Sequence, residues 1–197
     1  ENFSREVISS GFISTAVYDS EIDKYYIGGN FQDRNDLLRL NADGTIDETF
    51  QLTSEILLVN HIGLQSDGKI IVISLSTDRG IVRLNQDGSI DDTFDNNVGF
   101  NNSSFRDSDL AILADDKILF GGTFNSFNNE STSQLIRLNA DGSPDDSFSF
   151  AGNLTDQASP SINSVLPLSN GDIIIAGSFN SIYGNTAKSV ARLNSDG

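Results

Sequence analysis

Pairs of acidic side chains occur at three places in this sequence, and paired carboxylates can perform acid–base chemistry. The pairs are Asp47/Glu48, Asp91/Asp92 and Asp145/Asp146. In glycoside hydrolases one carboxyl acts as an acid and the other as a base or nucleophile. A catalytic pair needs one unique environment, whereas these pairs return once per sequence repeat. We therefore interpret them as structural, predict that the protein is not an enzyme, and assign it no catalytic residue and no cofactor.

The same acidic segments could bind calcium, which prefers oxygen ligands. An EF-hand loop needs glycine at its sixth position and glutamate at its twelfth. Counted from Asn41, however, glycine is fourth and the twelfth residue is Leu52. A tight hairpin also favours Asp-Gly for backbone reasons alone. We predict no metal site and keep calcium as the alternative, with three ligands in each of three segments: Asn41, Asp43 and Asp47; Asn85, Asp87 and Asp91; Asn139, Asp141 and Asp145.

The remaining reactive residue types offer no recognisable active site. The chain contains no cysteine, so a cysteine nucleophile and a thiolate zinc site are both excluded, and His61, the only histidine, lies in an apolar strand-like segment. The pairs Gly28-Gly29 and Gly121-Gly122 lack the spacing of a nucleotide-binding loop and no helix pattern follows them. Close packing between repeats, or a bend in a strand, explains these glycines better.

A repeat of about fifty residues positions all of these side chains. The motif Arg-Leu-Asn-x-Asp-Gly begins at Arg39, Arg83, Arg137 and Arg192. In the first three copies an acidic segment ending in phenylalanine follows, and the fourth copy stops at Gly197. A β-rich run precedes each copy, and in three of them it leads to Phe31, Phe124 or Phe179.

The motif itself predicts a β-hairpin with a three-residue loop. If Gly44 adopts the left-handed conformation after a type I turn, Leu40 faces Ile46 and Arg39 faces Asp47. The same register applies to the second and third copies, where Arg83 faces Asp91 and Arg137 faces Asp145. If exposed, such a cross-strand ion pair contributes less than about 1 kcal/mol. Pro144 takes the place of isoleucine in the third copy, which requires a sheet edge there.

Each repeat offers four short strands separated by turns, without helical periodicity. We therefore predict an all-β fold, a β-propeller-like array of four-stranded antiparallel blades. The chain is expected to be one propeller fragment (1–197) and part of a larger ring. The predicted blades are 12–51, 57–95, 107–150 and 163–197, the last one truncated.

The combined pattern of Gly-Gly-x-Phe, Arg-Leu-Asn-x-Asp-Gly and Asp-x-x-Phe resembles the bacterial delta-60 repeat. The resemblance covers nearly the whole chain, although the second copy lacks the Gly-Gly-x-Phe element. It implies a β-propeller in large secreted or surface-attached bacterial proteins. The family has no established catalytic or binding residues to carry over to this sequence.

The amino-acid composition restricts the classes of binding partner that we expect. The formal net charge is -16, which disfavours nucleic acid and anionic lipid as partners. No apolar run approaches the roughly 20 residues of a membrane span. We expect a non-catalytic scaffold or binding module of a secreted or surface-attached bacterial protein, acting in adhesion or recognition of a protein or carbohydrate, with further blades in the same chain. A polysaccharide hydrolase or lyase and a purely structural spacer are the alternatives.

Overall fold

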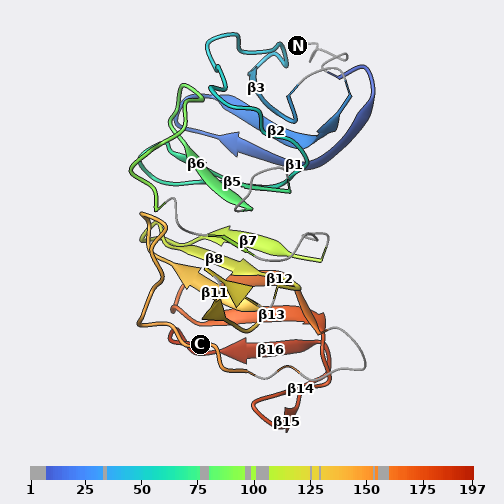
Figure 1. Cartoon of the computed structure of the whole chain (residues 1–197), viewed down its shortest axis with the longest axis vertical. Coiled ribbons are helices and arrows are strands. Elements are labelled where there is room, and N and C mark those ends of the chain that lie inside the picture. The colour runs from blue at the N-terminus through green and yellow to red at the C-terminus, as the bar shows by residue number, and fades with distance from the viewer. Residues whose placement is uncertain are drawn as a thin grey trace. The chain divides into compact units, whose positions relative to one another are not determined.

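The computed structural model describes residues 8–32, 35–75, 80–95, 99–100, 107–124, 126–128, 130–152, 154 and 160–197. The chain forms two compact units, Glu1–Phe94 and Asp95–Gly197. Every named element in these ranges is a β-strand (Figure 1). The described residues contain no helix with the length and hydropathy that a membrane crossing requires.

The first unit contains two antiparallel three-stranded sheets, one for each of the first two repeats. The sheet of repeat 1 has the order β1-β2-β3, with strands β1 (Gly11–Asp19), β2 (Lys24–Phe31) and β3 (Leu37–Asn41). The sheet of repeat 2 has the order β4-β5-β6, with strands β4 (Val59–Leu64), β5 (Ile70–Ser74) and β6 (Ile81–Leu84). Consecutive strands pair in both sheets, as the meander of a propeller blade requires.

The second unit repeats this plan and adds two short hairpins (Figure 1). Repeat 3 forms the sheet β7 (Asp109–Ile112), β8 (Ile118–Gly121) and β11 (Leu135–Leu138). Repeat 4 forms the sheet β12 (Ser161–Pro167), β13 (Ile173–Ser178) and β16 (Val190–Leu193). Each hairpin lies between the second and third strands of its sheet: β9 (Ser126–Phe127) with β10 (Glu130–Ser131), and β14 (Ser181–Ile182) with β15 (Asn185–Thr186).

The all-β class is confirmed, but the fourth strand of each blade was over-predicted. In the first three repeats it is reduced to one isolated bridge, formed by Leu40 with Ile46 in repeat 1. The chain turns immediately afterwards, because Asp47 accepts hydrogen bonds from the backbone and hydroxyl of Thr49, and the N–H of Phe50 donates to the Asp47 carbonyl. An aspartate that binds the backbone two residues ahead favours a turn over a continuing strand.

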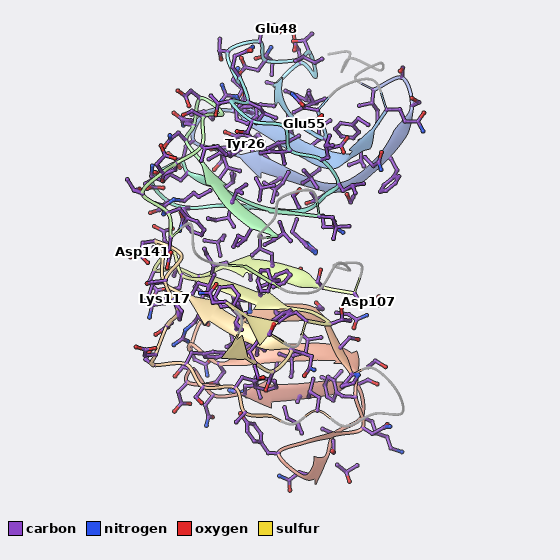
Figure 2. All side chains as sticks on the ribbon, in the orientation of Figure 1. Tyr26, Glu48, Glu55, Asp107, Lys117 and Asp141 are labelled. Atoms are coloured by element: carbon purple, nitrogen blue, oxygen red, sulfur yellow. The ribbon has the colours of Figure 1, made fainter. Side chains whose placement is uncertain are left out.

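Each unit buries its core between the sheets of its two repeats. In the first unit Tyr26 is fully buried among the strands (Figure 2) and packs with Ile62, Ile70 and Val72 of repeat 2. In the second unit Leu119 of repeat 3 packs with the corresponding residues of repeat 4. A repeat cannot bury its apolar face alone, so each sheet is stabilised by the one stacked on it.

Two of the glycines in the Gly-Gly pairs allow this stacking, as the sequence predicted. A Cβ atom at Gly28 would lie 2.4 Å from a methyl group of Val59, and one at Gly121 would lie 2.5 Å from a methyl group of Ile162. Each contact joins consecutive repeats within one unit. No side chain larger than hydrogen fits at these two positions unless the neighbouring sheet moves.

Candidate functional site

The hairpin of the repeated motif has the predicted register. In repeat 1 the N–H of Asn41 donates to the Thr45 carbonyl at 2.8 Å, and the N–H of Asp47 donates to the Arg39 carbonyl at 2.9 Å. The loop glycine of each copy has a positive φ: 82° at Gly44, 94° at Gly88, 89° at Gly142 and 109° at Gly197. The bridge between Leu138 and Pro144 leaves the proline outside the named strands, at a sheet edge.

The motif hairpin brings four polar side chains together in repeat 1, a group that we call the motif clamp. Arg39 Nε lies 2.9 Å from Asp47 Oδ2, and Lys24 Nζ lies 3.2 Å from the same oxygen. The other carboxylate oxygen accepts the Thr49 hydroxyl at 2.6 Å. That hydroxyl oxygen in turn accepts a hydrogen bond from Arg39 at 3.0 Å. One carboxylate therefore pairs with two cations and also fixes the turn.

Repeats 2 and 3 build the same clamp from corresponding residues. In repeat 2, Asp91 Oδ2 lies 2.7 Å from Arg83 Nε and 2.9 Å from Lys69 Nζ. In repeat 3, Asp145 Oδ2 lies 2.6 Å from Arg137 and 3.0 Å from Lys117, which Figure 2 places in the second unit. The sequence pattern predicted the pairing of the arginine and aspartate of each clamp but gave no role to the lysine, which begins the β-rich run before the motif.

The ion pairs of these clamps are buried, so the sequence-based estimate for an exposed pair does not apply. The side chains of Arg39 and Asp47 are only 7% and 6% exposed. Each arginine also lies over the ring of a motif phenylalanine, with the guanidinium carbon of Arg39 5.1 Å from the centre of Phe50. The corresponding distances in repeats 2 and 3 are 5.0 Å and 4.6 Å. This cover comes from the acidic segment itself, which folds its phenylalanine back over the pair.

The clamp arginine also links consecutive repeats within a unit. Arg39 donates to the carbonyl of Gln86 in the motif loop of repeat 2, and Arg137 donates to the carbonyl of Ser195 in repeat 4 at 2.6 Å. A backbone bond runs beside each contact, from Gln51 N–H to the Asp87 carbonyl and from Ser149 N–H to the Asp196 carbonyl. The motif therefore joins one blade to the next as well as shaping its own hairpin.

Repeat 4 departs from this arrangement. Asp172 stands where the other repeats have lysine, and its carboxylate accepts hydrogen bonds from Arg192 at 2.8 Å and 2.5 Å. The Arg192 side chain is 59% exposed. Its ion pair is a surface pair, unlike those of the three motif clamps.

The environment of each clamp lowers the pKa of its aspartate. Burial alone would raise the pKa of Asp47, but hydrogen bonds from Thr49 and Lys24, together with the Arg39 guanidinium, outweigh it and hold that pKa far below its usual value. The pKa values of Asp91 and Asp145 are lowered by the same kinds of contact. These three carboxylates therefore stay ionised at neutral pH and are poor candidates for general acids.

In each of the three segments of the calcium alternative, the carboxylates that would bind the ion already contact groups of the protein. In repeat 1 the ammonium group of Lys24 binds Asn41 Oδ1 and lies beside Asp47, so a protein cation already lies between these two oxygens. Asp43 instead binds the N–H and hydroxyl of Thr45 in its own loop. Across the described ranges, no cluster of three or more His, Asp or Glu side chains is arranged to hold a metal ion.

The two members of each acidic pair considered for glycosidase chemistry lie in different environments. The first member of each pair is the buried clamp aspartate, whereas Glu48, Asp92 and Asp146 are exposed. His61 lies half-buried in β4. Each pair therefore offers one carboxylate engaged with cations and one in solvent.

Sequence analysis missed a groove of about 670 Å³ in the second unit. Its apolar lining includes Phe127 of β9, Leu135 of β11 and Phe150, and its polar lining includes three consecutive hydroxyl residues, Ser131, Thr132 and Ser133. No hydrogen bond from these three hydroxyls occurs within the described part of the chain. The β9–β10 hairpin builds one wall, and Pro144 lines the groove where repeats 1 and 2 carry isoleucine. The inserted hairpin and the proline both depart from the first two repeats, and these departures were the features of the sequence that could have indicated the groove.

Comparison with known proteins gives a family match over most of these repeats. The model of the family described as "Domain of unknown function (DUF5122) beta-propeller" matches residues 23–50, 65–94, 113–148 and 168–197, together more than half of the chain. Each matched segment contains one copy of the Arg-Leu-Asn-x-Asp-Gly motif. No curated protein sequence matches this chain.

Solved structures with a similar fold are β-propellers and extracellular domains. The WD40 β-propeller domain of Doa1 is 20% identical, with a TM-score of 0.58, over 92% of this chain and 50% of that one. The extracellular domain of BT4673 from B. thetaiotaomicron is 17% identical, with a TM-score of 0.58, over 90% and 21%. That of BT3049 from the same organism is 16% identical, with a TM-score of 0.55, over 92% and 22%. This chain spans half or less of each of these structures, and at such identities the likeness concerns the fold alone.

Proposed function

We propose that this chain, which belongs to the DUF5122 β-propeller family, is a non-catalytic binding module of a secreted or surface-attached bacterial protein. The groove in the second unit carries the proposal, since it combines an apolar lining with three hydroxyls that form no hydrogen bond within the described part of the chain. Its volume of about 670 Å³ falls within the range of roughly 300–1,000 Å³ that is usual for small-ligand sites. The expected ligand is a carbohydrate or a short protein segment.

The motif clamps support a role without catalysis. Each clamp aspartate binds an arginine, a lysine and a hydroxyl, so its oxygens are occupied in the folded protein. A general acid or a nucleophile needs a carboxyl that can reach a substrate. The most regularly repeated polar residues of the chain thus hold the fold together, which leaves recognition to features that differ between repeats.

An extracellular location agrees with the fold neighbours and with the composition. Two of the similar structures are extracellular domains of B. thetaiotaomicron proteins. A net charge of -16 gives a strongly hydrated surface that repels nucleic acid. Adhesion or ligand recognition at the cell surface is the role we propose.

A matched pair of substitutions tests the groove. Ser131 lines it in β10, and Thr186 occupies the corresponding position of the β14–β15 hairpin, because Ser131 pairs with Ser126 as Thr186 pairs with Ser181. We expect the protein to bind a subset of probes on glycan or peptide arrays, Ser131→Trp to abolish that binding, and Thr186→Trp to retain it. An absence of binding on both arrays, or binding that survives Ser131→Trp, would overturn the groove and favour a structural spacer.

The enzyme alternative needs its own experiment. The wild-type protein is incubated with a panel of bacterial and plant polysaccharides, and released reducing ends and unsaturated products are measured. We expect neither to exceed the level of a heat-denatured sample. Product release that depends on the exposed carboxylates, tested with Glu48→Gln and Asp146→Asn, would establish a hydrolase or lyase in place of a binding module.

A further inference from the structure

The groove of the second unit runs along a sheet edge to which the described part of the chain adds no fourth strand. β11 is the outer strand of its sheet, in the order β7-β8-β11. Beyond β11 the chain forms only the bridge between Leu138 and Pro144 before it turns at Asp145. Residues of β11 and of the segment 144–151 line the groove together, so the groove lies where the fourth strand of a blade would be.

The register of β11 shows which of its backbone groups point toward this edge. The N–H of Gly122 donates to the carbonyl of Gln134, so these two residues form a hydrogen-bonded pair of the antiparallel ladder. Hydrogen-bonded pairs alternate along such a ladder with pairs that are not hydrogen-bonded. Ile136 therefore bonds to β8, whereas Leu135 and Arg137 direct their backbone groups away from β8.

Three of these outward backbone groups are available to a partner. The carbonyl of Arg137 accepts the N–H of Asp145 at 3.1 Å. The N–H of Arg137 and both backbone groups of Leu135, however, form no hydrogen bond within the described part of the chain. Leu135 is buried, and buried backbone groups are nearly always paired in folded proteins. The edge therefore needs a partner that supplies both donors and acceptors.

Repeat 1 shows what pairs at the corresponding edge. Asp36 precedes β3 as Gln134 precedes β11, and its carbonyl accepts the N–H of Gly29 in the same register. The N–H of Asp36 donates to the carbonyl of Ile56 at 3.2 Å, and Ile56 is buried against the sheets of the first unit. The N–H of Gln134 forms no such bond within the described residues. The edge of repeat 1 is thus paired with polypeptide backbone, which is the pattern we take for repeat 3.

The side chains around the groove restrict the composition of an added strand. Residues that face each other in a sheet lie on the same side of it, so the residue opposite Leu135 lies on the side where Leu135 packs with Phe150. That residue is therefore expected to be apolar. Asp146 lines the groove and is exposed, whereas Asp145 is already paired with the cations of its clamp. A basic side chain can pair with Asp146, and the net charge of -16 attracts a basic peptide.

We propose that the groove binds an extended peptide segment of a partner protein as an added strand along β11, with an apolar residue opposite Leu135 and a basic residue beside Asp146. This inference rests on the groove being the binding site proposed above, and it selects peptide over carbohydrate. The added strand exchanges two hydrogen bonds with Leu135 and accepts a third from the N–H of Arg137. In recognition by strand addition, main-chain bonds give the affinity and alternate side chains give the specificity.

Backbone N-methylation of the peptide tests the added strand directly. The full chain is screened on a glycan array and on an array of short peptides, and the strongest peptide is resynthesised with one N-methyl group at each position in turn. A strand presents every second N–H to its neighbour, so we expect N-methylation at alternate positions to weaken binding about tenfold and the positions between them to tolerate it. In NMR spectra the amide proton of Leu135 should shift downfield on binding, whereas that of Leu37, at the same position of repeat 1, should not.

A pair of aspartate variants tests the charge of the peptide. Asp146 lines the groove, and Asp92 is the exposed residue at the same position of the motif in repeat 2. We expect Asp146→Asn to weaken binding of the strongest peptide roughly threefold and to reduce its dependence on salt, and Asp92→Asn to change neither. Thermal melting confirms that both substitutions, at exposed positions, leave the fold intact.

The outcomes separate this inference from the proposed function on which it rests. Binding to glycans alone, abolished by Ser131→Trp, keeps the groove as a binding site and overturns the added strand. Peptide binding that tolerates N-methylation at every position, or that leaves the Leu135 amide unchanged, also overturns it, because side chains alone then hold the peptide. Silence of both arrays overturns the inference and the proposed function together. Equal losses in the two aspartate variants overturn the place given to the basic residue.

Discussion

The motif of repeat 1 and that of repeat 4 contain the same arginine in the same strand register, yet the two arginines lie in opposite environments. Arg39 is 7% exposed and pairs with a buried aspartate, under a phenylalanine ring and against the loop of repeat 2. Arg192 is 59% exposed and pairs with Asp172 of its own sheet. In repeat 1, the acidic segment and the loop of repeat 2 both contribute to the burial of the ion pair.

The comparison also bears on how such a pair stabilises the fold. Desolvating two charges opposes their attraction, so a buried pair gives little net stability compared with an apolar substitute. Breaking it by removing one partner is costly, however, because the remaining charge stays buried. The motif clamps of repeats 1 and 3 therefore favour one strand register and one neighbouring repeat, whereas the exposed pair of repeat 4 contributes little to either.

Acid should produce the largest difference between the clamps and the surface pair. The pKa values of Asp47, Asp91 and Asp145 are lowered in the folded protein, so their contribution is complete above the unfolded pKa of about 3.9. It is lost progressively as the pH falls from there through the lower pKa values of the folded state. We expect the free energy of unfolding, measured with guanidinium chloride, to be nearly constant from pH 7 to 5 and to fall steeply below pH 4. The Asp47→Asn variant should show a shallower fall. A profile that is flat down to pH 2.5 would contradict the role assigned to the clamps.

The buried and the exposed ion pair can also be compared by removing one carboxylate at a time. Asp47→Ala leaves Arg39 and Lys24 without their shared anion, so we expect a loss of about 3 kcal/mol of unfolding free energy. Asp172→Ala leaves Arg192 in solvent and should not change the denaturation midpoint measurably. Both variants are measured at pH 7 against wild type. Equal losses would show that cover by the next repeat does not distinguish the two motifs.

The hairpins could be predicted from the sequence because their determinants are local. Asp43 and Gly44 fix the loop, and the loop length fixes the facing of Arg39 with Asp47. The burial of that pair could not be predicted, since Gln86 of the next repeat supplies part of it. The predicted fourth strand failed for a local reason, the turn that Asp47 imposes on Thr49.

The groove was missed for a different reason. Its lining combines the β9–β10 hairpin with β11 and with Phe150, segments that repeat periodicity alone does not bring together. Features that recur in each copy are visible by comparing the copies, and they form the motif clamps. The bounds predicted for the individual blades and the absence of enzyme activity stay predictions.

Glycine substitutions compare a position that another repeat covers with one that is open, and we expect losses of unfolding free energy of intermediate size. Gly88 and Gly184 both have positive φ, 94° and 76°. A Cβ atom at Gly88 would lie 2.8 Å from the backbone of Gln51, whereas one at Gly184 would meet nothing within 4 Å. We expect Gly184→Ala to cost about 1 kcal/mol for its conformation alone. Gly88→Ala should cost about 1 kcal/mol more from overpacking. Equal losses in guanidinium denaturation would mean that the contact with Gln51 relaxes freely.

The smallest effect on stability is expected from calcium. The acidic loops contain oxygen ligands suited to this ion, but the cations of the motif clamps already occupy them. In repeat 1 a calcium ion would have to displace the Lys24 ammonium group from Asn41 and Asp47 and compete with Arg39 for the carboxylate. Asp43 already holds its own loop through Thr45, and Asp43→Asn should therefore change stability little, because an amide oxygen accepts the same bonds.

We therefore expect titration with calcium, followed by calorimetry and by melting temperature, to match titration with magnesium. The Lys24→Met variant sharpens the comparison, because it leaves Asn41 and Asp47 without their ammonium partner while repeats 2 and 3 keep theirs. If the lysine is what excludes calcium, this variant gains at most one weak site and the wild type gains none. A calcium-selective transition of the wild type near one ion per repeat, with a melting shift of many degrees, would instead make the nine loop residues ligands. The lysines would then have to leave their clamps on binding, which the loss of the lysine–aspartate contact in an NMR titration would reveal.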